Sequence, residues 1–104
     1  MQISFVFRQF EGTDDLKKLI AEKVRERLGG LLDGRDADVR VTIATEKAWT
    51  VLDFFVSVSG KVYKCTEKTT EIYPTIDLAL DKLERQMRKS RQRVREIKRR
   101  AKTQ

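Results

Sequence analysis

The chain has 104 residues, of which 38% are charged and 39% are hydrophobic, and its formal net charge is +7 at pH 7. This length is enough for a single domain with one modest core. The sequence has no histidine and one cysteine, Cys65, which removes the usual zinc sites and the Ser-His-Asp and Cys-His catalytic groups. It also has no glycine-rich phosphate loop and no paired-carboxylate motif. We therefore expect no metal, no cofactor, no small-molecule substrate and no enzymatic activity.

The hydrophobic pattern favours a cytoplasmic protein. The most hydrophobic run, residues 50–59, is interrupted by Asp53 and is too short to span a bilayer. Met1 leads straight into a strand pattern rather than into a signal peptide. A single cysteine can form no internal disulfide, which fits a reducing compartment. We expect cytoplasmic localisation and no membrane contact.

The first third of the chain predicts a strand and a helix. Residues 2–8 alternate apolar and polar side chains, which is typical of a half-buried strand. Thr13 is a typical helix N-cap, and the helix after it is expected to end at Gly29-Gly30. Its basic side chains are interleaved with Glu22 and Glu26, which favours a solvated face over contacts with RNA. The apolar face of this helix is predicted to comprise Leu16, Leu19, Ile20, Val24, Leu28 and Leu31.

The middle of the chain predicts two more strands. The cluster at residues 33–36 is typical of a turn, and the strand after it directs Val39, Val41 and Ile43 inward. A loop at residues 46–50 contains Trp49. A tryptophan there could stack on a nucleic-acid base, but we favour packing over the edge of the core.

The strand at residues 51–58 ends at Ser59-Gly60, a signal for a tight hairpin. If these two residues form the whole turn, Val58 pairs with Lys61 and Phe54 pairs with Cys65. This register buries Tyr63 and Cys65 and places Lys64, Thr66 and Lys68 on the outer face beside Phe55. A turn longer by one residue would reverse the faces of residues 61–68. Cys65 is interpreted as a small buried hydrophobic residue rather than a reactive thiol.

The last helix is predicted to begin between Thr70 and Pro74 and to run to about Arg100. At this length it would measure about 40 Å, longer than a small four-stranded sheet can cover. Its distal part, residues 89–104, is therefore expected to project as a basic end. The apolar stripe expected to pack on the sheet is Ile76, Leu80, Leu83 and Met87, and Ser90, Val94 and Ile97 continue the same spacing.

The charge of the chain is concentrated in this helix. Residues 82–102 hold eleven basic and two acidic residues, whereas the remainder has 12 basic and 14 acidic residues. Ordinary exposed helices mix charges of both signs, so this segment indicates contact with a polyanion. A parallel coiled-coil dimer would place Arg93 opposite Lys98 of the other chain. We therefore expect a monomer when the protein is free.

The predicted order of elements defines an α+β fold. It is a β-α-β-β-β-α two-layer sandwich, with a four-stranded mixed sheet, two helices packed on one face and a long basic C-terminal helix. The strands flanking the first helix can pair in parallel through a right-handed crossover, and the last three strands form a meander. The whole chain, residues 1–104, is interpreted as one domain.

Two adjacent motifs in the last helix resemble a known family. Residues 71–77, E-I-Y-P-T-I-D, are similar to the D-M-Y-A-A-I-D of the ribosome hibernation-promoting factor and ribosome-associated inhibitor family. Residues 81–89, D-K-L-E-R-Q-M-R-K, are similar to its D-K-L-x-R-Q-L-x-K run. The opening strand and the Glu11-x-Thr13-x-x-Leu16 pattern add weaker support, so the resemblance covers roughly the whole chain.

The resemblance implies a domain that binds 16S rRNA of the small ribosomal subunit in the channel used by mRNA and tRNA. Bound there, such a protein blocks the decoding sites and keeps ribosomes idle during stress or stationary phase. No residue after Gln104 could form the additional C-terminal domain of long members, which is linked to ribosome dimerisation, so we expect a short form or a truncated long form. The RNA-binding residues implied are Lys82, Arg85, Arg88, Lys89, Arg91, Arg93 and Arg95, with Arg8, Arg40, Lys64 and Lys68 as secondary candidates.

A second function is compatible with the same charge pattern. The arginine-rich segment would also suit a basic interaction module that binds an acidic protein partner, another structured RNA or a membrane surface. Sedimentation with ribosomes separates these possibilities. For RNA, guanidinium groups on a rigid helix are expected to contact phosphates and to read shape more than base sequence.

Overall fold

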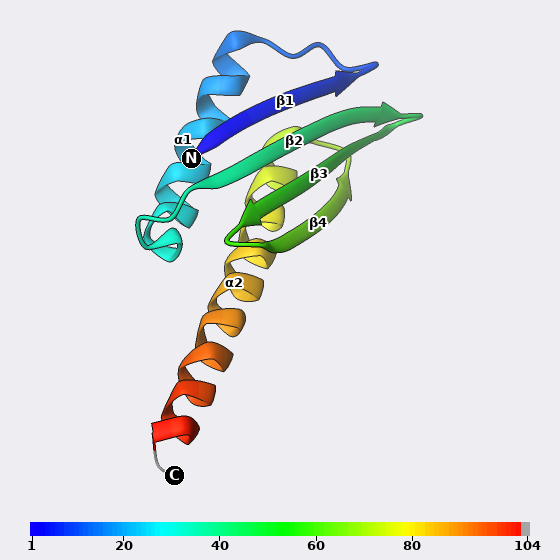
Figure 1. The fold of residues 1–104 in the computed structure, drawn as a ribbon. Helices are drawn as coiled ribbons and strands as arrows, with labels where there is room; N and C mark the ends of the chain where they lie inside the picture. Colours follow the sequence, from blue (N-terminus) through cyan, green and yellow to red (C-terminus); the bar gives the residue numbers. More distant parts are fainter. Residues whose placement is uncertain (103–104) are drawn as a thin grey trace.

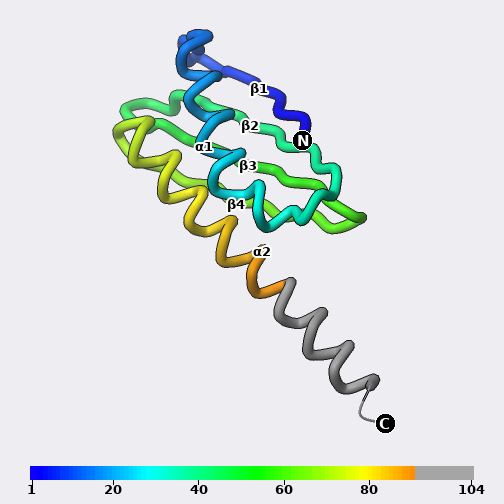
Figure 2. The backbone as a smooth tube through the Cα atoms, turned by 90° about the vertical axis from the view of Figure 1, so that its left-hand side faces the viewer, coloured from blue at the N-terminus to red at the C-terminus, as the bar shows by residue number. Residues whose placement is uncertain are grey.

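The computed structural model describes the backbone of residues 1–102 and the side chains of residues 1–90. The elements, in order, are β1 (Gln2–Arg8), α1 (Asp14–Leu32), β2 (Ala37–Glu46), β3 (Trp49–Val58), β4 (Lys61–Thr69) and α2 (Ile72–Lys102) (Figure 1). The strands lie in the order β1-β2-β3-β4; β1 is parallel to β2, and the other neighbours are antiparallel. Both helices cover one face of this sheet (Figure 2). The predicted α+β sandwich is therefore confirmed.

The core lies between the sheet and the helices. The four residues of α2 predicted to face inward, Ile76, Leu80, Leu83 and Met87, are all buried with at most 4% exposure. They meet the alternate side chains of β2 and β3 and the apolar stripe of α1 in one cluster. Such spacing is what an amphipathic helix needs to close one side of a sheet.

The hairpin between β3 and β4 has the predicted register. Ser59 and Gly60 both have positive φ, at 51° and 75°, as a two-residue type I′ turn requires. Val58 lies opposite Lys61 and Phe54 opposite Cys65, so the inner and outer faces of β4 are those predicted. Cys65 is buried, with 6% exposure.

Helix α1 begins as predicted but ends later. The hydroxyl of Thr13 accepts a hydrogen bond from the amide of Leu16 at 3.1 Å, which is the N-cap geometry. The predicted stop at Gly29-Gly30 is wrong, because the helix continues to Leu32, which is buried where the sequence favoured Leu31. Arg35 stabilises this later end of the helix: its Nε donates to the carbonyl of Leu32 at 2.8 Å, and its Nη2 donates to the carbonyl of Leu31 at 3.2 Å.

Trp49 also differs from the prediction. It is the first residue of β3 rather than part of a loop, and its side chain is 43% exposed. It points to the outer face because it pairs with Glu46, in phase with the outward residues of β2. The expectation that it covers the edge of the core is therefore wrong.

Candidate nucleic-acid interface

Helix α2 carries its charged side chains on two separate flanks beside the buried stripe. The flank that faces α1 is acidic, and the flank that faces β4 is basic. These flanks follow from the helical repeat, since residues three or four apart share a face. The acidic flank comprises Asp77, Asp81 and Glu84, and the basic flank comprises Lys82, Arg85 and Lys89.

Cations from α1 occupy the acidic flank. Lys23 Nζ lies 2.8 Å from Asp77 Oδ1. The Arg27 guanidinium contacts Asp81 through Nη2 and Glu84 through Nε, the latter at 2.5 Å. The hydrogen bonds that Arg27 donates to Glu84 and to Asp81, in that order of size, raise the pKa of its guanidinium above the ordinary value. These two basic residues of α1 therefore fix one helix against the other, so for Lys23 and Arg27 the predicted solvated face is wrong.

The basic flank contains one residue with a structural role. Lys82 forms an ion pair with Glu67 of β4, and this hydrogen bond raises the pKa of the Lys82 ammonium. The Glu67 side chain is 13% exposed because it points inward beside Tyr63 and Cys65 in the alternation of β4. Glu67 was not among the residues singled out from the sequence. The sequence signal that could have identified Glu67 is its acidic side chain at an inward-facing position of the strand, where a charge needs a partner.

Arg85 and Lys89 are the basic residues of this flank that remain available. Both are exposed, and neither forms an ion pair with any residue whose side chain is described. Arg88 lies toward the other flank, where its Nη2 is 3.7 Å from Glu84 Oε2 and its side chain is 66% exposed. An exposed pair at this distance contributes little to stability, so Arg88 can exchange its partner readily.

Strand β4 extends the basic flank into a wider surface. Gln86 Nε2 donates to the carbonyl of Lys64 at 3.1 Å, and Lys61 Nζ donates to Ser90 Oγ at 2.9 Å, so α2 is held along this edge strand. We call the surface formed here the β4–α2 ridge. It consists of Lys61, Lys64, Lys68, Lys82, Arg85 and Lys89.

The four secondary candidates all lie on the outer face of the sheet, away from the helices. Arg8 and Lys68 stand at the two ends of one row across the four strands, and Arg40 and Lys64 share another row. Lys64 and Lys68 form the outer side of the ridge, around edge strand β4 from the cations of α2. The structure thus brings the α2 residues 82–89 together with β4 and separates Arg8 and Arg40 from them.

Three predicted RNA-binding residues, Arg91, Arg93 and Arg95, have side chains outside the described residues. The basic end was expected at residues 89–104, and from residue 91 onward its side chains lie outside the described residues, so its projection stays a prediction. In the part of the chain with described side chains, no group of three or more His, Cys, Asp or Glu residues is placed to hold a metal ion. Among the described residues, no helix has the length and apolar character needed to cross a membrane.

The fold is that of a known class of small α+β domain, which two solved structures share. The N-terminal domain of Protein Y from Thermus thermophilus superimposes with a TM-score of 0.77 at 21% identity, covering 86% of this chain and 98% of that domain. A ribosomal subunit interface protein from Coxiella burnetii superimposes with a TM-score of 0.78 at 22% identity, covering 88% of this chain and 98% of that one. At these identities the likeness concerns the fold.

Sequence comparison identifies the family. The model of the family described as sigma 54 modulation protein / S30EA ribosomal protein matches residues 3–95, and the chain belongs to this family. The ribosome hibernation promoting factor of Azotobacter vinelandii is 31% identical over 93 residues, which are 89% of this chain and 85% of that protein. The family resemblance found in the motifs of the last helix is therefore confirmed.

Proposed function

We propose that this protein is a ribosome hibernation factor that binds 16S rRNA of the small subunit in the channel of mRNA and tRNA. Bound there in the cytoplasm, it blocks the decoding sites during stress or stationary phase. Membership of the family and the likeness to a hibernation promoting factor support a function at the ribosome. The same two comparisons favour a binding protein over an enzyme.

The observation that carries the proposal is the separation of charge on α2. Asp77, Asp81 and Glu84 are paired on the flank facing α1, so they are directed away from the β4–α2 ridge. Arg85 and Lys89 remain exposed and without an ion pair among the residues with described side chains. Unpaired cations on a rigid helix suit the phosphates of structured RNA, because they need not break an internal contact before binding.

The proposed interface includes the rest of the helix. Lys82 and Arg88 each keep an internal partner and add their charge at the rim, and the sequence continues the basic pattern through Arg91, Arg93 and Arg95. Lys64 and Lys68 lie on β4 beside this helix and extend the contact around the edge of the sheet. A monomer presents all of these residues without a second chain.

The test replaces the two available cations and measures binding to purified small subunits by co-sedimentation. Arg85→Gln with Lys89→Gln is expected to raise the dissociation constant at least about tenfold, since charge-assisted hydrogen bonds to phosphate are lost. The matched control is Lys18→Gln with Arg25→Gln, which removes the same charge from exposed positions of α1.

The control is expected to bind nearly as the natural protein does. Equal weakening by both double variants would mean that net charge, rather than the ridge, determines binding, and would overturn the assignment. Unchanged binding by the Arg85 and Lys89 variant would remove these residues from the interface. Neither double variant disturbs an ion pair of the described side chains, so unfolding is not expected to obscure the result.

A further inference from the structure

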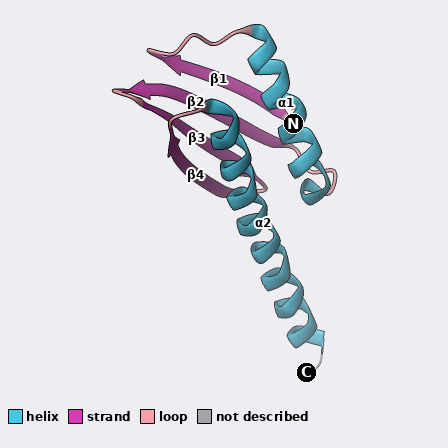
Figure 3. Cartoon of the chain, turned by 180° about the vertical axis from the view of Figure 1, so that it is seen from behind, coloured by secondary structure: helices cyan, strands magenta, loops and turns pink. Residues whose placement is uncertain are grey.

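The outer face of the sheet carries an aromatic ring between two cations. Phe55 of β3 has Arg40 of β2 and Lys64 of β4 as its direct cross-strand neighbours. Arg40 Cζ lies 5.7 Å from the centre of the ring, and Lys64 Nζ lies 5.5 Å from it. These distances are within the range of cation–π contacts. No helix covers this face: Figure 1 looks onto it with both helices behind the sheet, and the opposite view shows them lying across the other face (Figure 3).

The charges of this row are not balanced within it. Ser4 completes the row on β1, so the row holds two cations and no acid. Neither Arg40 nor Lys64 forms an ion pair with a residue of the part whose side chains are described. Asp53, in the next row, already accepts a hydrogen bond from the hydroxyl of Thr66 at 2.5 Å. Asp38 lies in the next row on the other side, so the row of Phe55 itself is a narrow cationic band that suits an anionic group.

The same combination of residue types recurs further along β3. Lys68 Nζ lies 5.2 Å from the centre of the Trp49 ring, and that ring is 43% exposed. Trp49 and Phe55 are six positions apart on one face of one strand, or about 20 Å. One exposed ring, Trp49, and one half-buried ring, Phe55, each with at least one cation beside it, thus lie along a single line on the sheet.

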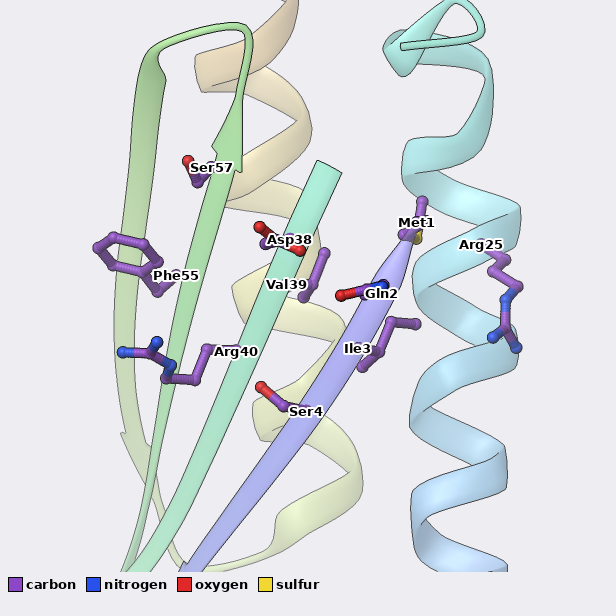
Figure 4. A pocket seen from close by; sticks show the side chains of 10 residues that line it. All are labelled: Met1, Gln2, Ile3, Ser4, Arg25, Asp38, Val39, Arg40, Phe55 and Ser57. Atoms are coloured by element: carbon purple, nitrogen blue, oxygen red, sulfur yellow. The ribbon is translucent and has the colours of Figure 1, made fainter. Parts of the chain in front are cut away.

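Phe55 also borders an open hollow of about 750 Å³, whose lining includes Met1, Ile3, Val39 and Arg25 of α1 as well as residues of the outer face. The close view shows Phe55 and Arg40 projecting on the same side of β2 and β3 (Figure 4). Polar side chains of the neighbouring strands offer hydrogen-bond donors and acceptors on the same face as the ring. The lining residues on the outer face are Gln2, Ser4, Asp38, Arg40, Phe55 and Ser57.

We propose that the outer face of the sheet is a second RNA-binding surface, which stacks unpaired bases of single-stranded RNA on Phe55 and Trp49. The aromatic rings would stack against bases, and the neighbouring cations would contact phosphates. Bases inside a duplex are already stacked on both faces, so this surface selects single strands. The inference rests on the proposed RNA-binding function and deepens it, because Lys64 and Lys68 join this face to the β4–α2 ridge.

The chain provides its own probe, since Trp49 is the single tryptophan of the sequence. A decamer of uridine is titrated into the natural protein at low salt, and Trp49 emission is recorded. The decamer is expected to quench this emission, while a ten-base-pair RNA duplex and a decamer of glutamate at the same charge concentration leave it nearly unchanged. Equal quenching by the duplex would overturn selection for single strands, and equal quenching by the peptide would overturn RNA as the ligand.

A variant then tests the stacking role of Phe55. Phe55→Leu keeps an apolar strand residue but removes the aromatic face, and it is expected to raise the dissociation constant of a labelled uridine decamer by about fivefold or more. The control is Val62→Ala, which changes a 50% exposed aliphatic residue of the same face. Unchanged affinity in Phe55→Leu overturns the proposal.

This result is separate from the test of the ribosomal function. Co-sedimentation with small subunits reports on Arg85 and Lys89, which do not contact Phe55 or Trp49 through any of the described ring contacts. If the uridine decamer fails to bind while the Arg85 and Lys89 variant still loses the subunit, the sheet face is excluded and the function at the ribosome stands. If the subunit does not bind at all, the proposed function itself is overturned.

Discussion

Lys82 of α2 forms an ion pair with Glu67 of β4, and the carboxylate of this pair is the more buried partner. Glu67 Oε1 is buried, and the Lys82 ammonium beside it supplies the charge that compensates its burial. The pair links the last helix to the edge strand. A residue that the sequence presented as an RNA contact thus also contributes to the fold.

The first prediction concerns this pair. Lys82→Ala is expected to lower the melting temperature, because it leaves a poorly solvated carboxylate without a partner. Glu67→Gln combined with Lys82→Ala is expected to recover much of the loss, since a neutral amide needs no counter-charge. Thermal unfolding followed by circular dichroism measures both variants. If the single variant melts as the natural protein does, or the double variant melts lower still, the carboxylate does not depend on Lys82.

The role of Lys82 has a consequence for mapping the interface. Loss of ribosome binding in Lys82→Ala would combine a lost phosphate contact with a weakened fold. Arg85 and Lys89 have no such partner among the described side chains, so their replacement reports on binding alone. The role of α2 in RNA binding should therefore be tested with Arg85 and Lys89 alone, and Lys82 should be replaced in a separate variant.

The second prediction concerns salt. If six to eight phosphates, an order-of-magnitude figure, are contacted, the slope of log affinity against log salt is expected to be steeper than about −4, because each contact releases condensed counterions. Binding to small subunits is measured at several potassium chloride concentrations. The Arg85→Gln, Lys89→Gln variant is expected to give a shallower slope by about 1 to 2. A flat dependence in the natural protein would contradict a contact based on phosphates.

Particular residues show how far the sequence predicts this structure. The β3–β4 register followed from Ser59 and Gly60, because a two-residue turn leaves only one pairing and therefore one inner face. The end of α1 did not follow from its glycines. Burial of Leu32 and the bonds from Arg35 outweigh the cost of glycine in a helix, and both depend on tertiary contacts.

The site shows the same division. Helical spacing was enough to place Lys82, Arg85 and Lys89 on one side of α2, but it could not show which of them has a partner. That depends on which β4 residue lies opposite, and Glu67 meets Lys82 only when the helix packs against the sheet. The exposure of Trp49 was missed for a related reason, since the pairing of Glu46 with Trp49 fixes the face on which the ring lies.

The third prediction compares two glycines. A Cβ on Gly12 would lie 2.3 Å from Cε2 of Phe7, a ring that stacks between Phe5 and Phe10. Gly12→Ala is therefore expected to destabilise the fold by about 1–3 kcal/mol. Gly30 lies exposed within α1 with nothing near its Cβ position, so Gly30→Ala is expected to stabilise by about 0.5–1 kcal/mol.

Urea unfolding of the two glycine variants gives both free energies. The comparison is internally matched, because each variant adds one methyl group. If both variants were stabilised, the Phe7 ring would move aside for the new methyl group at little cost. If both were destabilised, the added methyl group at Gly30 would meet a neighbour that the structure does not show.

The fourth prediction concerns Cys65 and pH. Burial, and then the negative charge of Glu67, raise the pKa of the Cys65 thiol above its ordinary value. In the unfolded chain the thiol loses its proton near pH 8.5, while in the folded protein it stays protonated at that pH. The unfolded state then binds fewer protons than the folded one. The free energy of unfolding therefore falls as the pH rises above about 8.5, and the contribution of Cys65 is complete below that value.

The measurement is urea unfolding between pH 7 and pH 10 for the natural protein and for Cys65→Ala. The variant is less stable at pH 7, because it leaves a small cavity, but it lacks the thiol titration. The difference in the free energy of unfolding between the natural protein and Cys65→Ala is therefore expected to become smaller as the pH rises. A difference that stays constant would mean that the thiol titrates alike in both states, and that the inner face of β4 is open enough to solvate a thiolate beside Glu67.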